Sequence, residues 1–394
     1  MGRALVIQLA RLGDLVQSIP VLTALKESHA NWDRDLLCPA PLAELGRMLP
    51  GIAEVLRWDG AAWHRRAAGA EEGVRPEHIA EADADLRAMT KYFYDRAFVL
   101  NQHPRAVTAG ALLARESIGA VSGGPVNHRL SPWAEYIRSV AVSKQSHRVH
   151  LADAFCGMCG LSPPKRIMPI QAPWTALPID LDPIGQSDGP WIGVLVGAGD
   201  QERLVPIGVW QRLIIECLDG LPTGRIVLIG NQHEQERAQW IQGELPSSLL
   251  SRVWDTTGRL SLVQLASLLT RCRTVIGADT GPLHLAAAVG IRVIGWYFSR
   301  ARVHETGPYG PHHWVWQAEA GEGNRVAAVK PNRWPITETI ALLGDLSAGA
   351  VKDWSLWRSY RDDLGAYYVE VGHEPIKPCQ REQIWRQLHP SLVA

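Results

Sequence analysis

The 394-residue chain lacks any excess of charge, because 40 basic side chains are matched by 40 acidic ones. Balanced charge gives no general attraction to nucleic acid, so we expect no nucleic-acid partner. No apolar stretch approaches the roughly 20 residues that a membrane-spanning helix needs. The first residues run directly into an apolar strand pattern without a signal-peptide cleavage region. These absences predict a cytoplasmic protein.

Cysteine is also scarce, with six residues in the chain. Cys156 and Cys159 are the only close pair, and no second pair of cysteines or histidines stands at zinc-ligand spacing. This favours reduced, structural cysteines over redox or metal chemistry. His312 and His313 lack a third ligand at suitable spacing, so we predict no metal site there.

Short apolar runs alternate with helical patterns over the first 345 residues, and the alternation restarts after a stretch rich in proline and glycine at 163–190. Such alternation predicts parallel sheets covered by helices on both faces. We therefore expect an α/β protein with two doubly wound domains, 1–175 and 176–345, facing a cleft, followed by an aromatic extension over 346–394.

The stretch from Gly277 to Gly290 stands out in the second domain. An apolar run ends at Gly277, and good helix formers follow Pro282, which a first helical turn tolerates. Asp279, Thr280 and Gly281 then precede a helix N-terminus, where unpaired amides favour an anion such as a diphosphate. The alternative is an ordinary capped turn with a buried histidine, His284.

Three further turns follow predicted strands. Asp14 lies in the first strand-to-helix turn, either as a helix N-cap or as a carboxylate available for chemistry. Arg203 follows a loop of small residues and either binds phosphate or is simply solvated. Glu234 or Glu236 could accept hydrogen bonds from a ribose, or both could face water at a helix start.

Taken together, these turns resemble a known family. The combination of Arg11-Leu-Gly-Asp14, Ile19-Pro20 and Leu25-Lys26 with the stretch Gly277–Gly290 is similar to glycosyltransferase family 9, the ADP-heptose:lipopolysaccharide heptosyltransferases and their relatives. The resemblance covers roughly residues 1–345. It implies a GT-B enzyme with two Rossmann-like domains, which is inverting, needs no metal and uses no cofactor besides its nucleotide-sugar substrate.

The resemblance also implies roles for single residues. Asp14 matches the general base, in a turn shared with Arg11 and Gly13 on the acceptor side. The expected donor-binding residues are Arg203, Glu234, Asp279, Thr280, Gly281 and His284: the last four hold the diphosphate and the adjoining sugar, and Glu234 the ribose.

Two positions depart from the family pattern. The usual Lys-x-Trp-Pro segment reads Arg203-Leu-Val-Pro206, which keeps a cation and loses the tryptophan. Ala198 and Gly199 stand where hydroxyl residues often contact phosphate. Thr306 and Tyr309, in a turn-rich segment that the family commonly carries near the donor, are secondary candidates.

The expected reaction moves a sugar, heptose from ADP-heptose, to lipopolysaccharide or a related surface glycan. Two alternatives stay open: a protein acceptor such as flagellin or an autotransporter, and a catalytically weak scaffold that binds nucleotide sugars. A lipid-linked acceptor would bring the protein into peripheral contact with the inner face of the inner membrane.

The extension over 346–394 is rich in aromatic residues with arginines between them. Trp354, Trp357 and Arg361 fall at helical spacing, which predicts a helix. We expect this extension to pack back on the first domain, or to recognise the acceptor or a partner.

Overall fold

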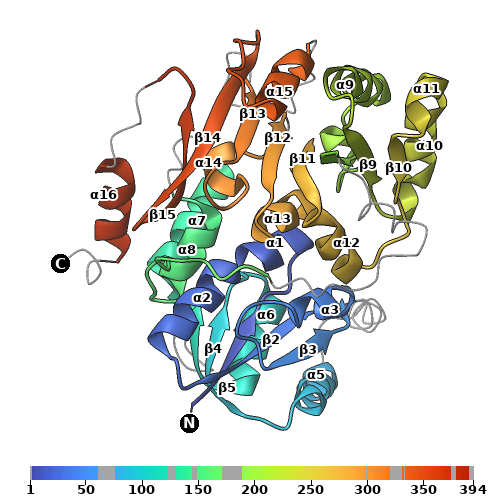
Figure 1. Ribbon diagram of the computed structural model, residues 1–394. Helices are drawn as coiled ribbons and strands as arrows, with labels where there is room; N and C mark the ends of the chain where they lie inside the picture. The colour runs from blue at the N-terminus through green and yellow to red at the C-terminus, as the bar shows by residue number, and fades with distance from the viewer. Residues whose placement is uncertain are drawn as a thin grey trace. The chain divides into compact units, whose positions relative to one another are not determined.

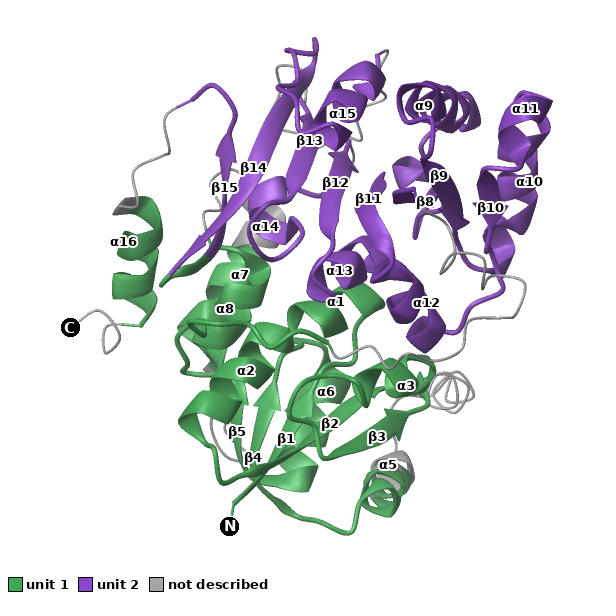
Figure 2. Ribbon diagram, viewed as in Figure 1, with its two compact units in different colours: residues 1–171, 363–365, 379–394 green, residues 172–362, 366–378 purple. Residues whose placement is uncertain are grey.

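The computed structural model describes residues 2–60, 76–122, 129–143, 149–170, 189–298, 300–319, 331, 333–373 and 379–389 (Figure 1). The chain forms two compact units (Figure 2). Unit 1 contains residues 1–171, 363–365 and 379–394, and unit 2 contains residues 172–362 and 366–378. The predicted boundary between residues 175 and 176 lies outside the described residues.

Unit 1 is built on a five-stranded parallel sheet in the order β3-β2-β1-β4-β5. The chain winds outward from β1 in one direction and then in the other, so β1 and β4 flank the point where the strand order reverses. The strands are β1 (Arg3–Ile7), β2 (Asp33–Pro39), β3 (Glu54–Trp58), β4 (Tyr94–Val99) and β5 (Ala114–Gly119). A small antiparallel pair, β6 (Val121–Ser122) and β7 (Arg129–Leu130), follows β5.

Unit 1 also contains helices. They are α1 (Leu12–Gln17), α2 (Ile19–Ser28), α3 (Ala43–Gly46), α5 (Pro76–Met89), α6 (Pro104–Leu113), α7 (Pro132–Ser143), α8 (Leu151–Met158) and α16 (Cys379–Leu388), with the 3-10 turn η1 (Ala40–Leu42). The apolar spacing of residues 14–27, with Leu15, Ile19, Leu22 and Leu25 on one face, predicts a single helix. This prediction is wrong, because the chain breaks between α1 and α2 at Ser18. Pro20 has no amide hydrogen and cannot continue a helix from Val16, but it fits the first turn of α2.

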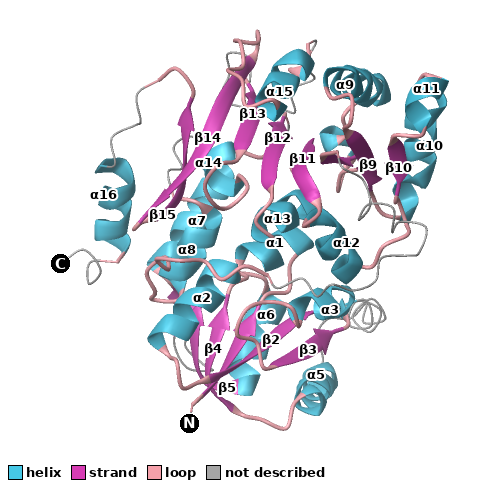
Figure 3. Cartoon of the chain, viewed as in Figure 1, coloured by secondary structure: helices cyan, strands magenta, loops and turns pink. Residues whose placement is uncertain are grey.

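Unit 2 has an eight-stranded sheet in the order β10-β9-β8-β11-β12-β13-β14-β15 (Figure 3). The strands are β8 (Trp191–Leu195), β9 (Arg225–Ile229), β10 (Val253–Asp255), β11 (Cys272–Ala278), β12 (Arg292–Tyr297), β13 (Trp314–Ala318), β14 (Trp354–Asp362) and β15 (Gly365–Glu370). Those from β10 to β13 are parallel, and β14 pairs antiparallel to β13. The prediction of two doubly wound α/β units is confirmed.

The helices of unit 2 are α9 (Ile207–Gly220), α10 (Gln235–Gly243), α11 (Ser247–Leu250), α12 (Leu262–Leu269), α13 (Gly281–Ala288), α14 (Val303–Thr306) and α15 (Ile336–Leu343), with turns η3 (Gln201–Arg203) and η4 (Gln232–Glu234). Helix α12 starts with a reciprocal cap between Ser261 and Gln264, whose two hydrogen bonds are 3.2 and 2.9 Å long. In the core, Trp210 of α9 stacks on Trp296 of β12 with ring centroids 5.1 Å apart. Helix and sheet are therefore joined by a large aromatic contact.

The helix predicted from Trp354, Trp357 and Arg361 is wrong, because these residues lie on β14. Trp354 and Leu356 are buried in the core of unit 2, where the strand adds to the edge of the sheet. Residues 346–394 therefore do not form one piece. Strands β14 and β15 extend the sheet of unit 2, whereas α16 belongs to unit 1, where Trp385 packs on Trp133 at a centroid distance of 4.4 Å.

Candidate functional site

The carboxyl ends of the parallel strands in unit 2 form one edge of its sheet. Arg203 follows β8, Glu234 follows β9 and Asp279 follows β11. Because parallel strands end at the same edge, three turns that are far apart in sequence meet there. Ligands of open α/β sheets bind outside this edge, so it is the natural place for a site.

Helix α13 begins at this edge as the sequence predicts. Thr280 is its N-cap, Gly281 opens the helix, and Pro282 lies in the first turn. The Thr280 side chain is 8% exposed, and its Oγ1 makes no hydrogen bond within the described part of the chain. A buried hydroxyl beside the positive end of a helix suits an oxygen-rich anion.

Asp279 is held between a cation and a histidine. The Nη1 of Arg203 donates to the Asp279 carbonyl at 2.9 Å and lies 3.4 Å from its carboxylate. The Nε2 of His284, on α13, is 3.4 Å from the other carboxylate oxygen. These contacts bring together Arg203, Asp279 and His284.

Arg203 also binds Asp200, to which its Nε donates at 2.8 Å. Burial by itself lowers the pKa of Arg203, but the hydrogen bond to Asp200 and the charge of Asp279 outweigh it and raise the pKa. The guanidinium is therefore a fixed positive charge at this edge. A Cβ at residue 199 would lie 2.9 Å from the Nη2 of Arg203. Gly199, which stands where the family often has a hydroxyl residue, therefore makes room for the arginine side chain.

Glu234 lies in a cradle of two glycines that sequence reasoning missed. A Cβ at Gly197 would lie 1.8 Å from Oε1 of Glu234, and one at Gly230 would lie 2.8 Å from Oε2. Oε2 accepts the backbone N–H of Asn231 at 2.6 Å. Burial raises the pKa of Glu234. Nearby, the guanidinium of Arg237 donates to the carbonyls of Val196 and Val205 and so holds the loop after β8.

In unit 1, Asp14 is the third residue of α1 rather than its N-cap, which is Arg11. The prediction that Asp14 is the N-cap is therefore wrong in position. Asp14 nevertheless caps the turn, because its Oδ2 accepts the N–H of Arg11 at 3.3 Å. Gly13 lies between them in the first turn of the helix.

Two polar residues that sequence reasoning missed organise this turn. Gln8 is fully buried and its Oε1 accepts from Nδ2 of Asn101, while Oδ1 of Asn101 accepts the N–H of Leu9. Gln8 follows β1 and Asn101 follows β4, the two strands that flank the reversal point of the sheet. Their position after adjacent parallel strands is the feature that could have revealed them.

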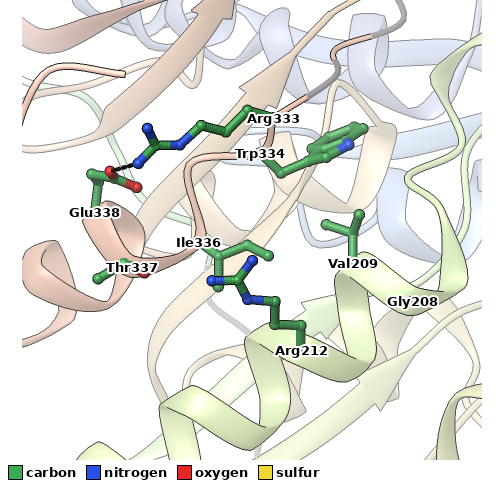
Figure 4. A pocket seen from close by; sticks show the side chains of 8 residues that line it. All are labelled: Gly208, Val209, Arg212, Arg333, Trp334, Ile336, Thr337 and Glu338. Carbon is green, nitrogen blue, oxygen red and sulfur yellow. Dashed lines mark hydrogen bonds and ion pairs between the residues drawn. The ribbon is translucent and has the colours of Figure 1, made fainter. Parts of the chain in front are cut away.

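A pocket of about 260 Å³ lies elsewhere in unit 2, between the first turns of α9 and α15 (Figure 4). Its charged groups already pair with one another or with neighbours: Arg333 with Glu338 at 3.0 Å, and Arg212 with Glu216 at 2.6 Å. Trp334 forms an apolar wall. The pocket contains none of the residues singled out from the sequence.

Among the residues that the structure describes, no group of three or more histidine, cysteine, aspartate or glutamate side chains could hold a metal ion. Cys156 and Cys159 are buried on and just after α8 and form no disulfide. No described helix is both long enough and apolar enough to span a membrane.

The profile described as glycosyltransferase family 9 (heptosyltransferase) matches residues 86–333, a range that starts after Asp14 and ends before β14. No curated protein sequence matches the chain.

Solved structures are similar in fold. The E. coli heptosyltransferase WaaC with ADP has a TM-score of 0.62 and 18% identity, with 87% of this chain and 99% of that chain covered. E. coli ADP-heptose LPS heptosyltransferase II has a TM-score of 0.59 and 18% identity, with 82% of this chain and 92% of that chain covered. The family 9 glycosyltransferase from Veillonella parvula DSM 2008 has a TM-score of 0.59 and 18% identity, with 80% of this chain and 85% of that chain covered. At such identities the likeness establishes a shared fold.

Proposed function

We propose, from the premise that this chain belongs to glycosyltransferase family 9 (heptosyltransferase), that it transfers heptose from ADP-heptose to lipopolysaccharide or a related surface glycan. Family membership makes the chain a glycosyltransferase with the two Rossmann-like domains of the GT-B fold. The observation that carries the choice of donor is the meeting of Arg203, Glu234 and Asp279 at one sheet edge, beside the N-terminus of α13. Similar folds have been solved with ADP and with ADP-2-deoxy-2-fluoro heptose.

The donor roles follow from the chemistry of each group. The diphosphate lies at the first turn of α13, where the Thr280 hydroxyl and the Gly281 amide donate and Arg203 supplies positive charge. Asp279 and His284 contact the adjoining sugar. Glu234, fixed by its glycine cradle, accepts hydrogen bonds from the ribose hydroxyls.

The acceptor role falls to unit 1. Asp14 takes the proton from the acceptor hydroxyl as its oxygen attacks the anomeric carbon, and the bond from that carbon to the diphosphate breaks on the opposite face. The configuration is thereby inverted, and ADP leaves with the bonding electron pair. Helix-terminal amides and Arg203 stabilise the developing charge of the diphosphate. In this proposal no metal or further cofactor takes part, so transfer persists in excess EDTA, and loss of activity that Mg²⁺ restores would overturn this part.

A lipid-linked glycan brings the protein to the inner face of the inner membrane as a peripheral, cytoplasmic enzyme. One observation favours a weaker catalyst, the scaffold alternative: the Arg203 guanidinium is already bound by Asp200 and Asp279, and Ala198 and Gly199 offer no hydroxyl to phosphate.

Mass spectrometry of surface glycans and flagellin from a deletion strain tests the proposal. The proposal predicts that the lipopolysaccharide or surface glycan loses a heptose, which the wild-type gene restores and the Asp14→Asn gene does not. Loss of heptose from flagellin or another protein would move the acceptor to the protein class. Unchanged glycans and proteins, or full restoration by Asp14→Asn, would contradict the enzymatic role.

A further inference from the structure

The β14–β15 hairpin lies beyond residue 333, where the family match ends, yet it contacts the segment from Thr306 to His313 in unit 2. That segment also reaches the neighbourhood of Asp279 and His284. A part of the chain outside the family profile is thus linked to the candidate donor site.

On the hairpin side, two buried residues fix the segment. The hydroxyl of Tyr368, on β15, donates to the Pro308 carbonyl at 2.7 Å. Its ring lies flush against Gly307, where an added Cβ would come within 2.4 Å of a ring carbon. Ser359, on β14, binds His313 twice: its Oγ accepts the His313 N–H at 2.7 Å, and its own N–H donates to the His313 carbonyl at 2.9 Å.

On the side of the donor site, Tyr297 makes the connection. Its hydroxyl donates to the Thr306 carbonyl at 2.9 Å. The pairing of Ala278 with Trp296 places Tyr297 beside Asp279, whose carboxylate raises the pKa of Tyr297 together with burial, the larger cause. The position of the segment therefore decides how Tyr297 is shared between Thr306 and Asp279. If Thr306 moves, the Tyr297 hydroxyl is released from its carbonyl and becomes available to the Asp279 carboxylate.

His313 lies at the other end of the segment, near enough to His284 for the two side chains to interact electrostatically. Burial, with smaller contributions from the nearby His312 and His284, lowers its pKa to about 4, although a hydrogen bond to the backbone of Tyr309 acts in the opposite direction. It is therefore neutral at pH 7. Its Nδ1, like the Oγ1 of Thr306, is buried with no hydrogen-bond partner among the described residues. Two buried polar atoms of this kind on one segment are typical of the wall of a binding site, where a bound ligand or a water molecule completes their hydrogen bonds.

We propose that Ser359 and Tyr368 are positioning residues of the donor site, because they hold the segment Thr306–His313 against Asp279 and His284. The inference rests on the proposed function, in which Asp279 and His284 contact the sugar of the nucleotide sugar. The hairpin acts through the segment and touches no substrate. The hairpin affects the affinity for ADP-heptose more than the affinity for ADP, because ADP lacks the sugar that the segment Thr306–His313 faces.

The test compares Tyr368→Phe with Tyr360→Phe. Phenylalanine at 368 keeps the ring against Gly307 and deletes only the hydroxyl, which donates to the Pro308 carbonyl and also hydrogen-bonds with the side chain of Ser359. Tyr360 on β14 is the matched control, because it is partly exposed, stacks on Tyr367, and its hydroxyl makes no hydrogen bond in the described part of the chain. Hydrogen–deuterium exchange is measured on the ligand-free protein, and calorimetric titration is carried out with ADP-heptose and with ADP.

The inference predicts faster exchange at 306–313 and at 279–285 in Tyr368→Phe, with neither changed in Tyr360→Phe. It also predicts that affinity for ADP-heptose falls about two- to tenfold, as for one lost hydrogen bond, while affinity for ADP stays within about twofold. Faster exchange confined to 306–313, or equal affinity of the wild type and Tyr368→Phe for ADP-heptose, would overturn it. If the wild type does not bind ADP-heptose, the donor proposal fails separately, and the exchange at 279–285 alone decides whether the hairpin positions Asp279 and His284.

Discussion

Replacing Gly197 with alanine is expected to remove Glu234 from its cradle. The new Cβ would lie 1.8 Å from Oε1 of Glu234, whereas ordinary contact begins near 3.4 Å. The carboxylate must therefore move by about 1.6 Å, the difference between these distances. Alanine is compatible with the backbone at Gly197, because φ there lies outside the left-handed region. The substitution therefore acts on the side chain of Glu234 and not on the backbone at residue 197.

The expected loss in binding can be estimated from the proposed contact with the ribose. A hydrogen bond to a charged group contributes about 1.5–3 kcal/mol, so ADP should bind roughly 10- to 150-fold more weakly to Gly197→Ala. Calorimetric titration with ADP measures this directly. Gly208→Ala is the control, because its added Cβ meets only Gln211 at 3.9 Å and should leave affinity unchanged. A Gly197→Ala protein that unfolds like the wild type and binds ADP equally well would refute the assignment of Glu234.

Three other predictions follow. Asp14→Asn should lower transfer on the order of 10²-fold or more while ADP affinity is unchanged, because the base acts on the acceptor; an unchanged rate would exclude Asp14 as the base. The pKa of His313 is near 4 in the folded state and near 6.5 when unfolded, so between these values the unfolded state binds the proton more readily and stability falls as pH falls. Between pH 7 and pH 4, the free energy of unfolding in urea should fall by about 3 kcal/mol more in the wild type and in a His312→Asn control than in His313→Gln. Equal pH dependence of the two variants would contradict the assignment. Asp35→Ala should cost about 3 kcal/mol of unfolding free energy, because it leaves the Arg3 guanidinium, now 2.9 Å from the carboxylate, without its buried partner; a loss below about 1 kcal/mol in urea unfolding would contradict this.

Local sequence determined the features that could be predicted. The strand, turn and helix around Asp279 depend on an apolar run, on a proline that fits a first helical turn, and on Gly290, which has a φ of 87° and ends the helix. The capping pair of Ser261 and Gln264 is equally local. Such features need only neighbours a few residues apart, so the sequence alone specifies them.

The missed features depend on contacts between distant residues. The Glu234 cradle joins Gly197 to a residue 37 positions later, and neither glycine is explained by its own neighbours. The amide pair of Gln8 and Asn101 spans 93 positions. No local pattern reports such contacts, because they arise only when parallel strands bring their carboxyl ends together.

The error at β14 has a different cause. The buried residues of this strand are Trp354, Leu356 and Ser359. The alternation of buried and more exposed positions that is typical of a strand therefore holds from 354 to 356 and then breaks. Bulky residues at 354 and 357 then imitate the three-residue spacing of a helix. Pairing with β13, in which Trp357 opposes Val315, decides the matter, and that pairing cannot be read from the strand alone.

The central claim is that the carboxyl edge of the unit 2 sheet binds the nucleotide of ADP-heptose. A crystal structure of the protein with ADP-heptose tests it most directly. The account predicts ribose hydroxyls within hydrogen-bonding distance of Glu234 and phosphate oxygens at the Thr280 hydroxyl and the Gly281 amide. A nucleotide bound elsewhere, for instance in the pocket between α9 and α15, with this edge left empty, would contradict it.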